Sequence, residues 1–149
     1  MSGSARKQGR GIKVLVIRQP WAWLIVNGFK DIENRTWDTR YRGPLLIQAS
    51  ASLPSKRDLE EFSLYARKRG AGLPESFETG GIVGMVQLED CVLASKSKWF
   101  LGPVGWVLSH PKRLKFIPLK GQLGLFDPPK AILGKLAAPN GGKVKGRAK

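Results

Sequence analysis

The side chains best suited to chemistry are concentrated between positions 18 and 35 of this 149-residue chain. Arg18 and Trp21 stand near the start of the stretch, and Lys30, Glu33 and Arg35 stand at its end. Charged side chains are rarely buried without a partner, so they make poor core material. Indole rings beside cations are what base stacking and phosphate contact require. The combination predicts a surface that contacts nucleic acid.

The spacing of Lys30, Glu33 and Arg35 leaves two arrangements open. On a regular strand Glu33 and Arg35 share one face and Lys30 lies on the other, so Lys30 meets Glu33 only where the backbone bends. Lys30 follows directly on the end of a predicted helix, where such a bend is reasonable. In the other arrangement Glu33 and Arg35 form a structural salt bridge and Lys30 is solvated.

These arrangements have different chemical consequences for Lys30. A lysine drawn into an apolar pocket loses its charge easily and can serve as a general base. A neighbouring carboxylate opposes that by stabilising the ammonium. A tight pair with Glu33 therefore favours contact with phosphate or a carbonyl group, and a loose pair leaves base chemistry open.

Two tryptophans are candidates for stacking on a base. Trp21 begins the predicted helix and Trp37 ends the charged strand, whereas a core position is favoured for Trp23 and Trp99. Ser50 follows a strand end, but no histidine or aspartate is placed to activate it as a nucleophile. The candidate ligand-binding residues are Arg18, Gln19, Trp21, Lys30, Glu33, Arg35, Trp37 and Ser50, and Lys30 and Glu33 are the catalytic candidates if the chain is an enzyme.

The elements that must position these residues can be read along the chain. Residues 13–17 are apolar and β-branched, which predicts a buried strand. A helix of two to three turns begins at Trp21, where apolar residues recur at helical spacing, and stops at Gly28. Residues 30–37 return to extended conformation, and residues 44–49 form an apolar strand.

The remaining elements favour a barrel. Ser55, followed three residues later by an aspartate, predicts the capping box of a helix that ends at Gly70. Further strands are expected over 81–91, 104–108 and 114–119. Gly84 marks a bulge or a close approach within the first of these. No strand–helix–strand alternation runs through the chain, which argues against a doubly wound sheet. We expect an α+β fold, a small β-barrel of five to six strands with two to three flanking helices.

Charge is distributed unevenly along the chain. The net charge is +15, and residues 1–13 carry four basic side chains and residues 129–149 carry six, with no acidic one in either segment. We therefore expect a folded domain over 13–128 between a flexible basic arm, 1–12, and a flexible basic tail, 129–149. Such ends either attract a polyanion such as nucleic acid or act as solvated segments that keep the protein soluble.

Composition excludes several classes of site and of protein. One cysteine and one histidine leave no internal disulfide, no CxxC site and no His-rich metal site, so we expect neither metal nor cofactor. No apolar run approaches the length of a transmembrane helix, and the N-terminus lacks the apolar region of a signal peptide. A cytoplasmic protein is expected, and a monomer, although the sequence does not determine the oligomeric state.

Several separated motifs resemble those of the ASCH domain, a branch of the PUA-like superfamily. The run Ile17-Arg18-Gln19-Pro20-Trp21-Ala22 is followed by a Gly-x-Lys-x-x-Glu-x-Arg element, matched at Gly28, Lys30, Glu33 and Arg35. Further similarity lies in residues 43–50, 105–108 and 121–126, and the resemblance spans roughly residues 13–127.

The resemblance implies a β-barrel with a cleft between its first helix and the barrel, lined or supported by Lys30, Glu33 and Arg35. It implies RNA, a nucleotide or a modified nucleobase as ligand, and roles around transcription coactivation, translation or RNA turnover. Some relatives are hydrolases, either N4-acetylcytidine amidohydrolases or single-strand ribonucleases. The small amidohydrolases carry threonine where this chain has Glu33, and relatives often carry histidine where it has Gln48. We therefore expect an RNA-binding module, with a hydrolase as the alternative.

Overall fold

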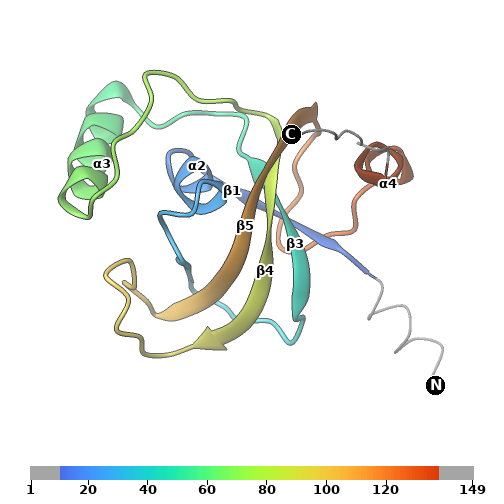
Figure 1. The fold of residues 1–149 in the computed structure, drawn as a ribbon, viewed down its shortest axis with the longest axis horizontal. Helices are drawn as coiled ribbons and strands as arrows, with labels where there is room; N and C mark the ends of the chain where they lie inside the picture. The colour runs from blue at the N-terminus through green and yellow to red at the C-terminus, as the bar shows by residue number, and fades with distance from the viewer. Residues whose placement is uncertain (1–10, 138–149) are drawn as a thin grey trace, which may run out of the picture.

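The computed structural model describes residues 11–137, which form one curled sheet with helices on both of its faces (Figure 1). The elements are β1 (Lys13–Ile17), α2 (Trp21–Val26), β2 (Ile32–Arg35), β3 (Gly43–Ala49), α3 (Lys56–Lys68), β4 (Gly81–Val92), β5 (Val104–Pro118) and α4 (Lys130–Ala137). The predicted basic arm falls almost wholly outside the described residues, and so does the tail beyond residue 137.

The sheet has the strand order β1-β3-β4-β5-β2, so β1 and β2 are its two edges. β1 runs parallel to β3, and the other neighbouring strands are antiparallel. Register shifts interrupt the pairing of β4 with both of its neighbours. Such irregularities increase the local twist of a sheet, which suits its curled, barrel-like shape.

Alternation along the strands divides the core between the two faces of the sheet. Leu15 and Ile17 belong to the buried cluster that includes α2, whereas Val14 belongs to the cluster that includes Ile132 of α4. Figure 1 shows α2 and α3 on one side of the sheet and α4 on the other. The α+β class with a barrel-like sheet and flanking helices is confirmed.

Two local expectations differ from the structure. The strands predicted over 104–108 and 114–119 are one strand, β5, with an irregularity at His110, whose φ is +52°. His110-Pro111 has the composition of a turn, but pairing with β4 on both sides keeps the chain in the sheet. The segment from residue 129 was expected to be a flexible tail, yet α4 begins at Lys130. Its Ile132 is buried in one cluster with Val14 of β1 and Ile82 of β4.

The short helix α2 approaches the sheet closely at Gly84. A Cβ atom at this position would lie 2.5 Å from the carbonyl oxygen of Lys112 and 2.5 Å from Cγ1 of Val26. A glycine is therefore required where β4, β5 and α2 meet, which agrees with the close approach predicted for this position. The packing of α2 against the sheet fixes where Trp21 and the residues after the helix lie.

We predict that Gly84→Ala lowers the free energy of unfolding by roughly 1–3 kcal/mol, because the added methyl group overpacks this junction. Urea denaturation monitored by circular dichroism measures the change. Gly72→Ala is the matched control, since a Cβ there meets nothing within 4 Å. Equal urea midpoints for the two variants would show that the junction is not tightly packed.

Candidate functional site

The turn that follows α2 directs Lys30 into the protein. Gly28 adopts a φ of +85°, and the N–H groups of Phe29 and Lys30 both donate to the carbonyl oxygen of Leu24, at 2.9 and 3.0 Å. A φ in this range favours glycine because a Cβ would be strained there. The bend brings the Lys30 side chain to the same side as Glu33, which strand alternation alone does not do.

Lys30 is buried and paired. It is 6% exposed, and its ammonium donates to the carbonyl oxygen of Ile32 and lies 3.3 Å from Oε1 of Glu33. The Trp21 ring centroid is 5.8 Å from the nitrogen, within the range of a cation–π contact. Burial lowers the pKa of Lys30 below its ordinary value of 10.5, and the attraction of Glu33 offsets only part of this effect. The interpretation in which Lys30 is solvated is therefore wrong.

Glu33 has a second cation on its other oxygen. Its Oε2 lies 3.3 Å from Nε of Arg35, and Nη2 of Arg35 donates to the carbonyl oxygen of Val16 at 2.8 Å. Val16 lies on one edge strand of the sheet and Arg35 on the other. The guanidinium therefore joins the two edges, and the structural salt bridge considered in the sequence exists together with the Lys30–Glu33 pair.

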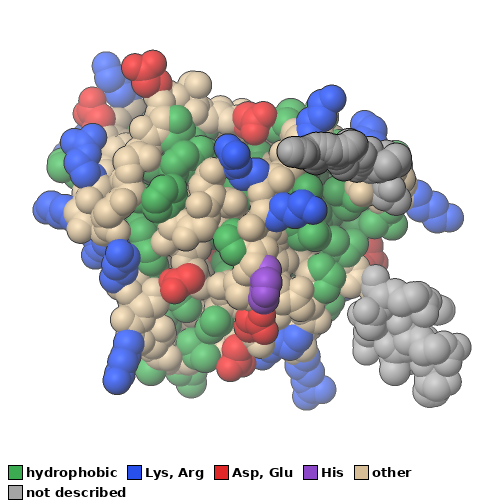
Figure 2. Space-filling view, in the orientation of Figure 1, with side chains coloured by type: hydrophobic (Ala, Val, Ile, Leu, Met, Phe, Trp, Pro, Cys, Tyr) green, Lys and Arg blue, Asp and Glu red, His purple; other side chains and the backbone are tan. Residues whose placement is uncertain are grey.

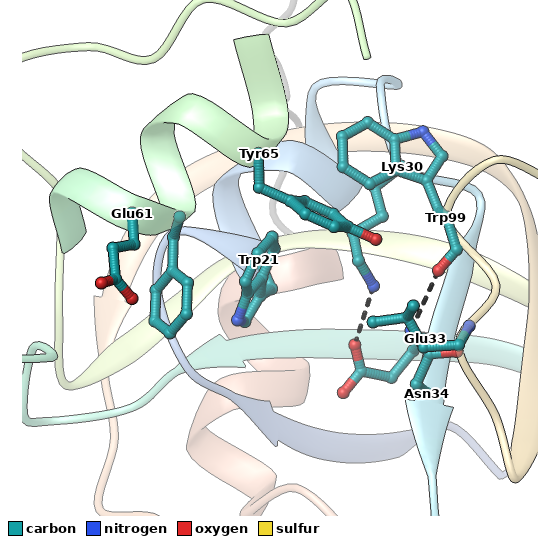
Figure 3. A pocket seen from close by; sticks show the side chains of 9 residues that line it. Trp21, Lys30, Glu33, Asn34, Glu61, Tyr65 and Trp99 are labelled. Carbon is teal, nitrogen blue, oxygen red and sulfur yellow. Dashed lines mark hydrogen bonds and ion pairs between the residues drawn. The ribbon is translucent and has the colours of Figure 1, made fainter. Parts of the chain in front are cut away.

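A cavity of about 430 Å³ opens beside this pair. It is lined by Trp21, Lys30, Glu33, Asn34, Glu61, Phe62, Tyr65, Trp99 and Leu101, and we call it the Lys30 cavity. In Figure 3 the Lys30 amine points to the carboxylate of Glu33, and the rings of Trp21 and Tyr65 stand beside this pair. The ring centroids of Trp21 and Tyr65 are 5.9 Å apart in an edge-on arrangement.

The polar groups of the Lys30 cavity differ in how well they are satisfied. The Asn34 amide makes three hydrogen bonds, since it donates to the Trp99 carbonyl and accepts from the N–H groups of Leu101 and Gly102. Asn34 thus fixes the loop that carries Trp99. The Tyr65 hydroxyl and the Trp99 indole nitrogen are buried without a hydrogen-bond partner within residues 11–137. A polar ligand in the cavity can satisfy such groups.

The other predicted site residues lie elsewhere. Arg35 and Ser50 line a second cavity of about 770 Å³, which we call the Arg35 cavity. Gln19 lines a third, where its amide caps the Trp23 N–H and donates to the Glu78 carbonyl. Trp37 packs edge-on against Trp106, with centroids 4.8 Å apart, and Arg18 is exposed and lines none of these three cavities. The structure does not bring these five residues into the Lys30 cavity.

Sequence reasoning missed several cavity residues. Phe62 and Tyr65 were not among the candidate site residues, and Trp99 was expected in the core, yet all three line the Lys30 cavity. Trp99 is indeed 2% exposed, yet one part of it borders the cavity. Their spacing was an available signal, because Phe62 and Tyr65 are three residues apart on α3 and both rings therefore lie on one face of the helix. Nothing in the sequence specified that this face packs over Trp21.

Fold and site together define a PUA-like α+β domain with an aromatic cavity bordered by α2, α3, β2 and the loop that carries Trp99. A profile of the ASCH domain matches residues 15–113. The chain belongs to the ASCH domain family.

Relatives and solved structures agree with this assignment. The human protein Activating signal cointegrator 1 is 38% identical over 87 residues, which cover 56% of this chain and 15% of that protein. The mouse protein of the same name is 38% identical over 81 residues, covering 52% of this chain and 14% of that protein. This chain thus spans only about one seventh of the length of these curated relatives.

The fold matches crystal structures of an ASCH protein from Zymomonas mobilis. That protein superimposes with a TM-score of 0.53 at 15% identity, covering 87% of this chain and 95% of the other. Its tyrosine-to-phenylalanine variant gives a TM-score of 0.55 at 15% identity, covering 87% and 98%. At this level of identity the likeness concerns the fold alone.

Metal-ligand clusters and membrane-spanning helices are both absent from residues 11–137. No group of three or more His, Cys, Asp or Glu side chains there is arranged to hold a metal ion. Of the helices described, none has the length and apolar character needed to cross a membrane.

We predict that Arg35→Met lowers the free energy of unfolding by about 2 kcal/mol, because it removes a charge-assisted hydrogen bond between the sheet edges and a partner of Glu33. Urea denaturation measures the loss. Arg40→Met, a change at an exposed arginine five positions away, should leave the midpoint unchanged. If both variants behave alike, the guanidinium does not hold the edges together.

The lowered pKa of Lys30 predicts a pH dependence of stability. Between that pKa and 10.5 the unfolded chain holds a proton on Lys30 that the folded chain has lost, so stability rises with pH. We expect wild type to gain stability relative to Lys30→Met over this window. Burial raises the pKa of Tyr41, which acts in the opposite direction, but this contribution is common to both proteins. Parallel stability profiles from neutral pH to pH 11 would contradict the prediction.

Proposed function

We propose that this chain binds single-stranded RNA and accommodates one nucleobase, plain or modified, in the Lys30 cavity. The observation that carries the proposal is a ring of four aromatic side chains, Trp21, Phe62, Tyr65 and Trp99, around a buried amine–carboxylate pair. A volume of about 430 Å³ lies within the range of small-ligand sites. Family membership and the net charge of +15 support a nucleic-acid ligand.

Each part of the cavity has a suitable role in holding a base. The indole of Trp21 and its aromatic neighbours offer faces and edges for stacking, which tolerates any base. Two N–H groups of the Lys30 ammonium are directed to Ile32 and Glu33, so the third can donate to a carbonyl oxygen or ring nitrogen. Glu33 can accept from an exocyclic amine, as carboxylates do with cytosine.

The surface charge attracts RNA without selecting a sequence. Figure 2 shows lysine and arginine side chains spread around one face of the molecule rather than gathered in a single patch. Contacts between such cations and phosphates are sequence-independent and weaken as salt is added. Selection of a base must therefore come from the Lys30 cavity.

We also propose that the protein is cytoplasmic and monomeric.

One observation favours a second function, hydrolysis in the same cavity. The pKa of Lys30 is lowered by burial, which is the condition under which a lysine can act as a general base. In the neutral amine two N–H groups would stay on Ile32 and Glu33, and the lone pair would face the ligand. Glu33 would then position the amine. Against this, the same carboxylate stabilises the charged, non-basic form.

We predict that Trp21→Ala weakens binding of a fluorescein-labelled single-stranded oligoribonucleotide roughly tenfold, the effect of losing one stacked base. Fluorescence anisotropy at low ionic strength measures the affinity, and a salt titration should show a steep loss. Trp23→Ala is the matched control, because Trp23 is on the same helix but does not line the Lys30 cavity.

Failure of wild type to bind any RNA at low salt would refute the proposal, as would equal losses in the two tryptophan variants. Incubation with N4-acetylcytidine and with single-stranded RNA separates binding from hydrolysis. Tight binding without turnover is the expected result. Turnover that Lys30→Ala abolishes would instead establish the hydrolase.

A further inference from the structure

The Arg35 cavity lies on the other side of the Lys30–Glu33–Arg35 chain and has a different chemical character. It has a volume of about 770 Å³ and lies between the first strand β1, residues 48–51 at the end of β3, and the loop 119–124 after β5. Its charged and hydrogen-bonding side chains include Arg35, Gln48, Ser50 and Lys120. Nothing in the proposal above uses it.

Gln48 lines this cavity and carries a buried polar atom without a partner within the described residues. The side chain is 1% exposed, and its Nε2 donates to the carbonyl oxygen of Leu119 at 2.6 Å. Because only the amide nitrogen can donate to that carbonyl, the orientation of the amide is settled by the hydrogen bond. Its Oε1 is buried and accepts no hydrogen bond from residues 11–137. A ligand that fits here should present a hydrogen-bond donor to this oxygen.

The two cavities also differ in the sign of their charge. Arg35 and Lys120 are basic, and no acidic residue lines the Arg35 cavity. The Lys30 cavity contains one cation and two carboxylates, Glu33 and Glu61. The lining of the Arg35 cavity therefore favours an anion more than that of the Lys30 cavity, and a neutral base has no such preference.

The loop over the Arg35 cavity offers backbone donors as well. None of the N–H groups of residues 120–125 is hydrogen-bonded within the described chain. Gly121 passes close to β1, where a Cβ would lie 3.1 Å from Cγ2 of Val16, and Gly124 has a φ of +67°. Glycine-rich turns with open N–H groups are suited to phosphate oxygens.

We propose that the Arg35 cavity binds a ribose-phosphate unit of an RNA strand and distinguishes RNA from DNA. The phosphate contacts Arg35, Lys120 and the loop N–H groups, and the ribose 2′-hydroxyl donates to Oε1 of Gln48. A deoxyribose leaves this oxygen unpaired, which disfavours DNA. The link to a strand rests on the proposed function, because the neighbouring base would occupy the Lys30 cavity.

Continuity between the cavities follows from Glu33. One carboxylate oxygen contacts the cation of the Lys30 cavity and the other contacts the guanidinium of the Arg35 cavity. The carboxylate of Glu33 therefore contacts one lining cation of each cavity. An RNA strand that crosses the place where Arg35 joins the two sheet edges can reach both cavities. Its base then lies in the Lys30 cavity and its backbone in the Arg35 cavity.

The first experiment needs no base and so does not depend on the proposed function. Ribose 5-phosphate, 2-deoxyribose 5-phosphate and inorganic phosphate are titrated separately into ¹⁵N-labelled wild-type protein. We expect ribose 5-phosphate to shift the side-chain amide of Gln48 and the backbone amide of Gly121, and to bind at least about fivefold more tightly than the deoxy sugar. Equal affinities, or no shift at these groups, would overturn the proposal.

The second experiment tests the binding of a whole RNA strand. RNA and DNA oligonucleotides of one sequence are compared on wild type, Lys120→Ala and Lys96→Ala, the last removing an exposed lysine that lines none of the three cavities. We expect only Lys120→Ala to weaken RNA binding severalfold and to reduce the salt slope by about one. Gln48→Met should bring RNA affinity down to that of DNA.

The outcomes separate the two proposals. If Trp21→Ala weakens RNA binding but Lys120→Ala matches Lys96→Ala, base binding stands and the ribose-phosphate site is wrong. If ribose 5-phosphate binds as expected but Trp21→Ala has no effect, the ribose-phosphate site stands and the base cavity is wrong. The sugar-phosphate comparison on wild type keeps the test decisive even if Gln48→Met fails to fold.

Discussion

The carboxylate of Glu33, held between two cations, is the interaction on which the rest of this structure depends. Burying Lys30 without a counter-charge would be very unfavourable, and Glu33 supplies that charge at 3.3 Å. The same carboxylate orients Arg35, whose guanidinium reaches the carbonyl oxygen of Val16 on the opposite edge strand. One side chain therefore anchors the end of the first helix to the sheet and helps to close that sheet.

This arrangement also lies between the two cavities described above. Lys30 and Glu33 line one cavity and Arg35 lines another, so the linked ion pairs lie between two separate cavities rather than in one shared cleft. Glu33 and Glu61 keep the aromatic side unattractive to phosphate, while the opposite side contains only basic ionisable groups. Burial and the attraction of Glu33 act in opposite directions on the pKa of Lys30, so their balance decides whether the amine donates a hydrogen bond or accepts a proton.

Much of the fold followed from local sequence signals, and the site followed only in part. The strand over 13–17 and the helix that begins after Ser55 were indicated by apolar patterning and by a capping residue, whose hydroxyl does accept from the Asp58 N–H. The Lys30–Glu33 contact depends on the turn after α2, where two N–H groups share the Leu24 carbonyl, and strand alternation does not encode such a turn.

Tyr65 and Trp99 reach the Lys30 cavity from distant segments, through packing that the local sequence pattern does not specify. The single strand β5 likewise depends on its pairing with β4, which outweighs the local turn signal at His110-Pro111.

The Gly-x-Lys-x-x-Glu-x-Arg element can now be understood as a folding device. Gly28 permits the left-handed turn, and the turn admits Lys30 to the interior. Glu33 and Arg35, two apart on β2, share a face and pair there. Each spacing is thus required by the backbone before any ligand is considered. A change at Glu33 would disturb the fold and both cavities together, whereas Trp21 and Lys120 each line only one of them. Residues on the cavity walls such as Trp21 and Lys120 can therefore be changed without breaking the ion pairs that hold the fold, and Glu33 cannot.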